Sequence, residues 1–223
     1  MSELLVRERG AVPPDAGSVF ERIAEDLATR GFSVIDGAVP TALAISLAIE
    51  VRERSATAFH WASIGREQTQ MVNGFVRRDA ICWIEGESEA ERDWLAWIVQ
   101  LKTALNRRLY LGLFSFECHF AHYPPGAFYK RHVDAFRGEA NRVLTTVLYL
   151  NPAWGPDDGG ELVLHLDADN EETVRLRPTL GTLVVFLSEA FPHEVLPAQR
   201  DRYSIAGWFR VNASCAARAD PPR

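Results

Sequence analysis

The stretch RYSIAGWFRV, residues 202–211, has the length and composition of a β-strand. Because successive residues of a strand point to opposite faces, its even-numbered residues share one face. Two of these residues, Ser204 and Ala206, are small. They leave a hollow that Arg202 and Trp208 border on either side. The stretch therefore predicts a strand with one face lining a pocket.

Six more strand-like runs precede this one, and clusters of Pro, Gly and Asp or Asn separate them. Seven or eight short strands of this kind fit a jelly roll built from two sheets. Because helical patterns come before the strands, the expected fold class is α+β. The six runs are Phe116–Tyr123, Phe128–Val133, Arg142–Leu150, Glu161–Leu166, Thr173–Leu176 and Thr182–Leu187.

Three helical patterns occupy the first half of the chain. A capping box of the form Ser-x-x-Glu at Ser18 predicts the start of the first helix. Pro40 opens the second, which runs to about Arg54. A second capping box at Ser88 starts the third helix, which ends near Gly112 and carries a stripe of tryptophans. We interpret this stripe as core packing rather than as a ligand site.

Two short strands and a long loop lie between these helices, at Phe32–Ile35, Ile81–Glu85 and residues 61–80. The loop is polar and aperiodic, and long loops in compact domains are often functional, so we expect it to be mobile. The expected organisation is a flexible leader (1–14), a single domain (15–212) with helical support (15–113) and a jelly-roll core (114–212), and a flexible tail (213–223).

Charge and composition argue against several classes of partner. The 223 residues carry a formal net charge of −6, which disfavours nucleic acid because phosphate binding relies on Lys and Arg. A run of about 18 apolar residues is absent from the sequence, so no membrane span is expected. Residues 1–9 mix both charge signs, which argues against a secretory signal and for a cytoplasmic location. Cys82, Cys118 and Cys215 form no Cys-x-x-Cys pair, so we expect free thiols.

His132 and Asp134 stand two residues apart in a strand-like run, so both side chains point the same way and can bind one metal ion. A third ligand has to come from elsewhere in the sheet, and His193 follows after several intervening strands. Two histidines and one carboxylate hold non-haem Fe(II) on one face and leave positions open for a co-substrate and dioxygen. The three residues therefore predict a catalytic iron centre.

Arg202 follows His193 at the start of another strand and predicts a carboxylate site. Its planar, permanently charged guanidinium suits the distal carboxylate of 2-oxoglutarate, which it can bind through two parallel hydrogen bonds. Tyr149 shares a strand face with Thr145 and Val147, and its phenol is a candidate second donor to that carboxylate. The alternative for Tyr149 is a core tyrosine with a satisfied hydroxyl.

These motifs and their neighbours closely resemble the 2-oxoglutarate-dependent prolyl hydroxylases, in particular the oxygen-sensing enzymes of animals and their bacterial counterparts. The resemblance extends over roughly residues 20–211, and the combination of motifs is specific. It rests on GFSVID at 31–36, AHYP at 121–124, YKRHVD at 129–134, LYLN at 148–151, GGEL at 159–162, PHEV at 192–195 and RY at 202–203.

The resemblance implies a double-stranded β-helix with supporting helices, and hydroxylation of a prolyl residue in a cytoplasmic protein. It implies Fe(II) as metal, 2-oxoglutarate and dioxygen as co-substrates, and allows ascorbate as an accessory. It also implies a flexible finger at residues 61–80 that folds over the substrate. The implied roles are iron ligation for His132, Asp134 and His193, anchoring of 2-oxoglutarate for Arg202 and Tyr149, pocket walls for Tyr123, Val147, Leu162 and Trp208, and contact with the target segment for Tyr129 and Arg142.

Other functions remain as alternatives at this point. A free amino acid or another small molecule could be hydroxylated on the same fold. Oxidative nucleic-acid demethylation is disfavoured by the acidic charge and because Trp208, not an arginine, stands six residues after Arg202. A metal-binding sensor without turnover would need no carboxylate clamp, so the presence of Arg202 and Tyr149 argues against it.

Overall fold

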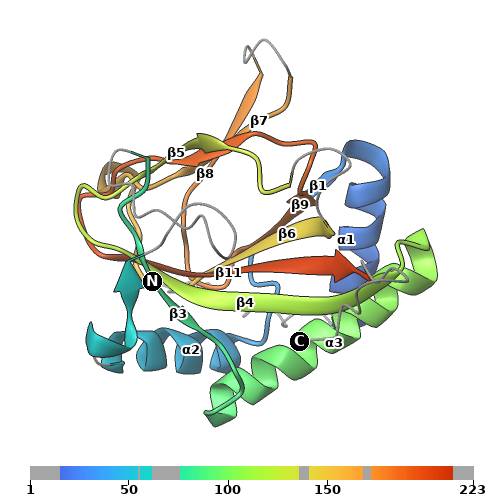
Figure 1. Ribbon diagram of the computed structural model, residues 1–223, viewed down its shortest axis with the longest axis horizontal. Helices are drawn as coiled ribbons and strands as arrows, with labels where there is room; N and C mark the ends of the chain where they lie inside the picture. The colour runs from blue at the N-terminus through green and yellow to red at the C-terminus, as the bar shows by residue number, and fades with distance from the viewer. Residues whose placement is uncertain (1–15, 55, 62–75, 136–140, 168–171, 213–223) are drawn as a thin grey trace, which may run out of the picture.

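Two antiparallel sheets face each other, and three helices cover the outer side of the larger one (Figure 1). The computed structural model describes residues 16–54, 56–61, 76–135, 141–167 and 172–212. No helix among these residues is long and apolar enough to cross a membrane. The expected α+β class with a two-sheet jelly roll is confirmed.

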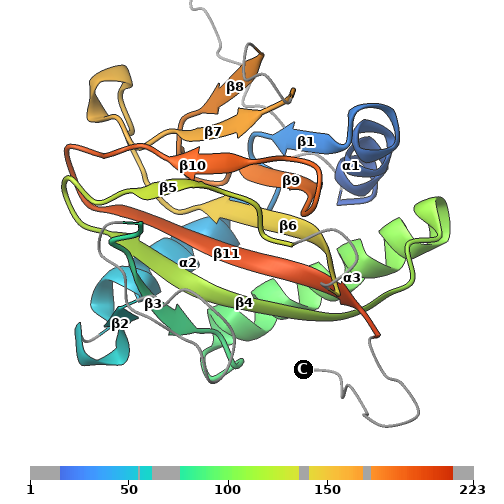
Figure 2. The ribbon, with the colours of Figure 1, turned by 45° about the horizontal axis from the view of Figure 1, so that its top comes forward.

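The larger sheet has seven strands and the smaller one four (Figure 2). The larger sheet has the order β1 (Phe32–Ile35), β9 (Leu183–Leu187), β6 (Arg142–Tyr149), β11 (Arg202–Val211), β4 (Leu113–Tyr123), β3 (Ala80–Trp83) and β2 (His60–Trp61). The smaller sheet has the order β5 (Tyr129–His132), β10 (His193–Val195), β7 (Leu162–His165) and β8 (Thr173–Leu176).

The helices are α1 (Ala16–Arg30), α2 (Thr41–Glu53) and α3 (Glu89–Leu109), with short 3-10 turns at Ala56–Ala58 and Pro156–Asp158. Their apolar faces pack on the larger sheet, where Trp94 and Leu101 of α3 are fully buried, as the tryptophan stripe predicts. Ser88 caps α3 by accepting a hydrogen bond from the backbone N–H of Glu91, which confirms that capping box.

The alternation in β11 sets the two faces of the larger sheet. Ile205 and Phe209 are fully buried in the core that the helices form with this sheet. Ser204 lies on the other face, opposite Ala121 of β4 and Tyr149 of β6 in the strand register. Ala121 and Tyr149 belong to a second core, between the two sheets. The pocket-lining face predicted from residues 202–211 is therefore the inner face of the jelly roll.

The prediction that Ser18 caps the start of the first helix is wrong. α1 begins at Ala16, so Ser18 lies within the first turn rather than before it. Val19 and Phe20 are buried, and packing of this apolar face stabilises a turn that begins before the sequence motif. The sequence also does not predict β10, because a strand of three residues is too short to show an alternating pattern.

The predicted loop, residues 61–80, includes residues at both ends that the structure places in ordered contacts. Trp61 belongs to β2, and Arg77 forms an isolated antiparallel β-bridge with Tyr129, the first residue of β5. Asp79 is 1% exposed and binds Arg77 through both carboxylate oxygens, so this end of the segment is fixed by a buried ion pair. Residues 62–75, the rest of the expected loop, lie outside the described residues.

Candidate metal and co-substrate site

The jelly roll brings His132, Asp134 and His193 together, as the sequence predicts. His132 ends β5, His193 begins β10, and the two histidines are direct cross-strand partners. Asp134 follows β5 by two residues. One candidate ligand atom from each side chain lies within 4.8 Å of the other two. Among the described residues, these three form the group of His, Cys, Asp or Glu side chains that could hold a metal ion.

Both histidines are oriented by backbone carbonyls. Nδ1 of His132 lies 2.8 Å from the carbonyl oxygen of Lys130, and Nδ1 of His193 lies 3.0 Å from that of Phe191. A carbonyl can only accept a hydrogen bond, so Nδ1 carries the proton in the neutral form of each ring, and that form has its lone pair at Nε2. Both Nε2 atoms are therefore free to ligate a metal, and they lie 3.4 and 3.7 Å from the Asp134 carboxylate.

One oxygen of Asp134 is held by two donors. Nε1–H of Trp208 donates to Oδ2 at 2.9 Å, and the hydroxyl of Thr145 donates to the same atom at 2.8 Å. Burial alone would raise the pKa of Asp134, but positive charge on His193 and His132 in their protonated form, with the Trp208 hydrogen bond, holds that pKa well below its usual range. The carboxylate is thus ionised, and Oδ1 faces His132.

Arg202 is buried without an acidic partner among the described residues. It is 2% exposed, Nε–H donates to the Gly160 carbonyl at 2.8 Å, and Nη1 lies 3.5 Å from the Ser204 hydroxyl. Its guanidinium carbon stands 5.0 and 5.1 Å from the ring centres of Tyr123 and Tyr149. A buried cation requires a counter-ion, and none of the described residues supplies one here.

The Tyr149 hydroxyl is a second unsatisfied group beside Arg202. It is buried and has no hydrogen-bond partner among the described residues. Burial raises the pKa of Tyr149 to about 12, against the opposing effect of the Arg202 charge, so the phenol stays protonated and can donate. Tyr123, Val147 and Leu162 pack around it between the sheets. This bears against the alternative of a core tyrosine with a satisfied hydroxyl.

The donor set and the unsatisfied groups fit the metal and co-substrate that the sequence predicts. Two imidazoles and one carboxylate, converging from two elements, match the ligand set of non-haem Fe(II). The buried Arg202 and the unpaired Tyr149 hydroxyl offer hydrogen bonds to a carboxylate, which would satisfy both.

Tyr129, Arg142 and Trp208 surround the other side of the triad. The Tyr129 ring stacks on His132 at 3.6 Å between ring centres. The Arg142 guanidinium lies over Trp208 at 3.8 Å and pairs with Glu117 of β4 at 2.7 Å. All three are partly exposed, so they are accessible to an incoming substrate.

Sequence reasoning missed the hydrogen bonds that orient Asp134. Strand alternation predicts that Thr145 shares the face of Tyr149, but its contact with Asp134 depends on how β6 meets the segment after β5. Ser188, 2.9 Å from the Thr145 hydroxyl, gives no signal in the sequence at all. The resemblance implies that Trp208 is a wall of the 2-oxoglutarate pocket, and the structure brings its indole N–H to the metal-site carboxylate.

Comparison with known proteins agrees with this geometry. Residues 118–210 match the family model described as the 2OG-Fe(II) oxygenase superfamily. The crystal structure of a Pseudomonas putida prolyl-4-hydroxylase is 46% identical, with a TM-score of 0.79, and the alignment covers 86% of this chain and 99% of that one. A Trichoplax adhaerens prolyl hydroxylase, solved with a peptide of hypoxia-inducible factor, is 27% identical, with a TM-score of 0.73 over 87% of this chain and 90% of that one.

Human Egl nine homolog 1 is 30% identical over 142 residues, which is 60% of this chain and 33% of that protein. The chain thus spans about a third of the length of this animal relative. The P. putida enzyme, by contrast, is matched along almost its whole length. The chain therefore belongs to the 2OG-Fe(II) oxygenase superfamily and, within it, to the prolyl hydroxylase family.

Proposed function

We propose that this chain hydroxylates a prolyl residue in a protein, with Fe(II) as metal and 2-oxoglutarate and dioxygen as co-substrates. The observation that carries the proposal is the buried Arg202, which has no acidic partner among the described residues and lies in the jelly roll that holds the His132, Asp134 and His193 cluster. The names of the relatives support the prolyl substrate, since all three are prolyl hydroxylases or Egl nine proteins.

His132, Asp134 and His193 would hold the iron, which supplies oxidative decarboxylation of 2-oxoglutarate coupled to hydroxylation when bound. The chain's own contribution is orientation. Backbone carbonyls select the neutral tautomer that has its lone pair at Nε2 of both histidines, and Trp208 and Thr145 orient the Asp134 carboxylate.

Arg202 and Tyr149 would bind the distal carboxylate of 2-oxoglutarate. Tyr123, Val147 and Leu162 would line the pocket and exclude water from it. In a dry pocket the charged hydrogen bonds from Arg202 are stronger than they would be in water. Trp208, at the triad end of β11, would close the side nearest the metal.

Tyr129 and Arg142 would contact the segment that carries the target proline. Their partial exposure beside the triad supports this role, as does their fixed geometry: Tyr129 stacks on His132, and Glu117 holds Arg142.

We also propose that residues 15–212 form one oxygenase domain, because a continuous core joins the helices to the larger sheet. A cytoplasmic location for the enzyme and its protein partner is supported by Cys82 and Cys118, which are free thiols. Reduced cysteines are typical of proteins from a reducing compartment.

Mass spectrometry of protein substrates tests the function. The purified chain, supplied with Fe(II) and 2-oxoglutarate in air, is incubated with a native protein extract, and prolyl peptides are searched for the added mass of one oxygen atom. His132→Ala serves as the inactive control. We expect hydroxylated prolyl peptides with the native chain only. Turnover of free proline at least as fast as that of any polypeptide would replace the proposal with the small-molecule alternative.

A further inference from the structure

A groove of about 1010 Å³ opens between α2 and the first half of α3. Leu43 and Ile49 of α2 line one side, and Ala90, Ala96 and Trp97 of α3 line the other. Both helices cover the outer face of the larger sheet, whereas the triad lies on the inner side, where His193 packs on Phe186. An occupant of this groove would therefore not compete with 2-oxoglutarate.

The floor of the groove is apolar and open to solvent. Ile49 is 51% exposed, and Ile45, one helical turn earlier on the same face of α2, is 44% exposed. Ile49 lines the groove together with Leu43, Ala96 and Trp97, so these apolar side chains share one surface, whereas Ile45 is not among the lining residues. Contiguous surfaces of this kind mark interaction sites more often than isolated exposed residues do.

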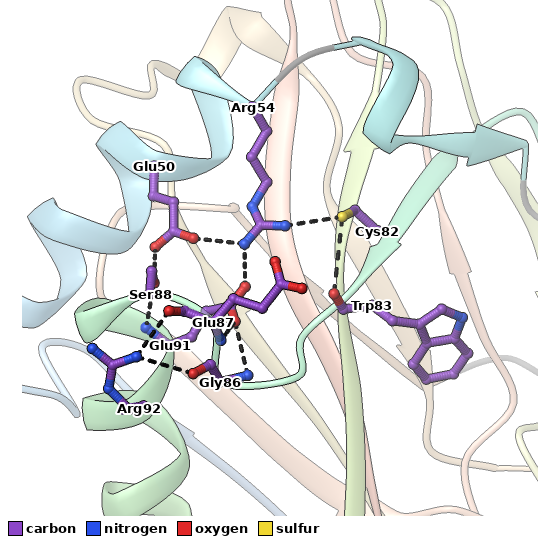
Figure 3. Close-up of polar contacts among 9 residues, drawn as sticks. All are labelled: Glu50, Arg54, Cys82, Trp83, Gly86, Glu87, Ser88, Glu91 and Arg92. Carbon is purple, nitrogen blue, oxygen red and sulfur yellow. Dashed lines mark hydrogen bonds and ion pairs between the residues drawn. The ribbon is translucent and has the colours of Figure 1, made fainter.

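Arg54, the arginine that lines the groove, has carboxylate partners within the protein. Arg54 pairs with Glu50 at 2.7 Å and with the buried Glu91, as Figure 3 shows. Glu50 also accepts a hydrogen bond from Ser88 at 2.6 Å, so this network ties α2 to the start of α3 and forms one wall of the groove.

Three further carboxylates of the groove, Glu53, Glu89 and Asp93, are exposed and form no ion pair among the described residues. Local helix stability does not account for all of them. Glu53 ends α2, where the helix dipole disfavours a negative charge. Glu89 and Asp93 stand four residues apart on α3, a spacing at which like charges repel. Glu89 itself lies in the first turn of α3, where the helix dipole favours a negative charge, but a cation above the groove would offset the charge of Glu53 and the repulsion between Glu89 and Asp93.

We propose that the α2–α3 groove is a docking site for a basic amphipathic helix of a partner protein. Apolar side chains on one face of such a helix would fill the floor beside Ile49 and Trp97. Lys or Arg residues flanking that face would pair with the three carboxylates. A second copy of this chain fits less well, because a two-fold contact through the groove would bring acidic rim against acidic rim.

A labelled peptide tests the charge and shape requirement. The probe is a helical peptide of about 18 residues with Leu at i, i+3, i+4 and i+7 spacing and Lys on its flanks. A matched peptide carries Glu in place of every Lys. Binding to the full chain is followed by fluorescence anisotropy at low and at physiological ionic strength. We expect the Lys peptide to bind, more weakly as salt rises, and the Glu peptide not to bind.

Substitutions then locate the site. The triple variant Glu53→Gln, Glu89→Gln, Asp93→Asn should weaken binding about 10-fold, as expected for several exposed ion pairs lost together. The control triple Glu25→Gln, Glu172→Gln, Asp157→Asn removes the same charge from exposed positions elsewhere and should leave binding within about 2-fold. Ile49→Gln should weaken binding at least several-fold, and Val99→Gln, at a similarly exposed position outside the groove, should not.

Three outcomes would overturn the proposal. The first is equal loss of binding in the two triple variants, or none in either. The second is a dimer in sedimentation velocity that the groove triple dissociates, which would assign the groove to a second copy. The third is probe binding that appears only after residues 1–14 are deleted, which would assign it to the chain's own N-terminal segment. Circular dichroism and 2-oxoglutarate turnover, expected to be unchanged, show that each variant is folded.

Discussion

Arg202 and Arg54 are two arginines withdrawn from solvent in very different ways. Arg54 has Glu50 and Glu91 as partners from two helices, and its side chain is still 17% exposed. Arg202 is 2% exposed, yet its hydrogen-bond acceptors are a backbone carbonyl and a serine hydroxyl. The more deeply buried cation is therefore the one for which the described residues supply no anion.

The difference separates a structural charge from a binding charge. Taking an ion out of water costs several kcal/mol, and a protein recovers that cost only through a well-placed counter-ion. At Arg54 the counter-ions are Glu50 and Glu91, which join helix to helix (Figure 3). At Arg202 we infer that the counter-ion is the carboxylate of a ligand. The chain would thus carry a destabilised site that its co-substrate completes.

Glu91→Gln should give the largest change, because it removes a buried counter-ion. The substitution leaves Arg54 with Glu50 alone and weakens the hydrogen bonds from the N–H groups of Gly86 and Glu87. We expect the free energy of unfolding to fall by about 3 kcal/mol, at the lower end for a broken buried pair. Denaturant unfolding measures it.

Glu89→Gln is the matched control for that loss, since Glu89 lies two residues away, is exposed, and forms no ion pair among the described residues. It should change the unfolding free energy by less than about 0.5 kcal/mol. Equal effects of the two substitutions would show that Arg54 does not depend on its buried partner.

His119 sharpens the comparison, because a histidine can lose its charge and an arginine cannot. His119 is 4% exposed, and burial lowers its pKa to about 4, below its ordinary value of 6.5. The unfolded chain takes up the proton first as the pH falls. The contribution of His119 to the free energy of unfolding is therefore complete above pH 6.5, and it is lost as the pH falls from 6.5 to about 4.

We expect this one group to change the unfolding free energy by about 3 kcal/mol across that interval. His119→Gln should flatten the pH dependence of stability by that amount. Parallel pH profiles for the native chain and the His119 variant would contradict the burial argument.

Arg202→Lys tests the binding charge directly. Lysine keeps the charge but loses the planar pair of donors, so 2-oxoglutarate binding should weaken by about 1–3 kcal/mol. Isothermal titration with Mn(II) in place of iron measures affinity without turnover. Arg200→Lys, two residues away and 46% exposed at its side chain, is the control. An unchanged affinity in the Arg202 variant would end the assignment of Arg202 to the co-substrate.

Short-range patterns made much of this site predictable. His132 and Asp134 share a face because residues two apart in a strand do so, and the same rule placed Arg202 and Ser204 inside the jelly roll. The capping box at Ser88 was right because its motif coincides with the start of the buried face of α3. At Ser18 the same motif failed, because packing of Val19 and Phe20 extends α1 beyond it.

Contacts between distant elements were not predictable. The Glu50–Arg54 pair follows from a spacing of four residues in a helix, but Glu91 reaches Arg54 only because α2 and α3 pack together. Likewise strand alternation gives the face on which Trp208 lies, but the sequence predicts no partner for its indole N–H. Strand periodicity gives the side on which a residue lies, whereas a contact with Asp134 requires the relative placement of the two sheets.

Trp208→Phe should give the smallest effect, and it tests whether the metal site too depends on partners supplied by the chain. Phenylalanine keeps an aromatic ring for Arg142 to pack on but cannot donate to Asp134, so the carboxylate loses one of its two orienting hydrogen bonds. Loss of such an outer contact typically costs about 10-fold in metal affinity. Mn(II) binding followed by electron paramagnetic resonance measures it without catalysis. Trp83→Phe is the control, since Trp83 also packs on His119 but makes no contact with Asp134 among those described. If both variants bind Mn(II) as the native chain does, Thr145 alone orients the carboxylate, and Trp208 serves only as a wall.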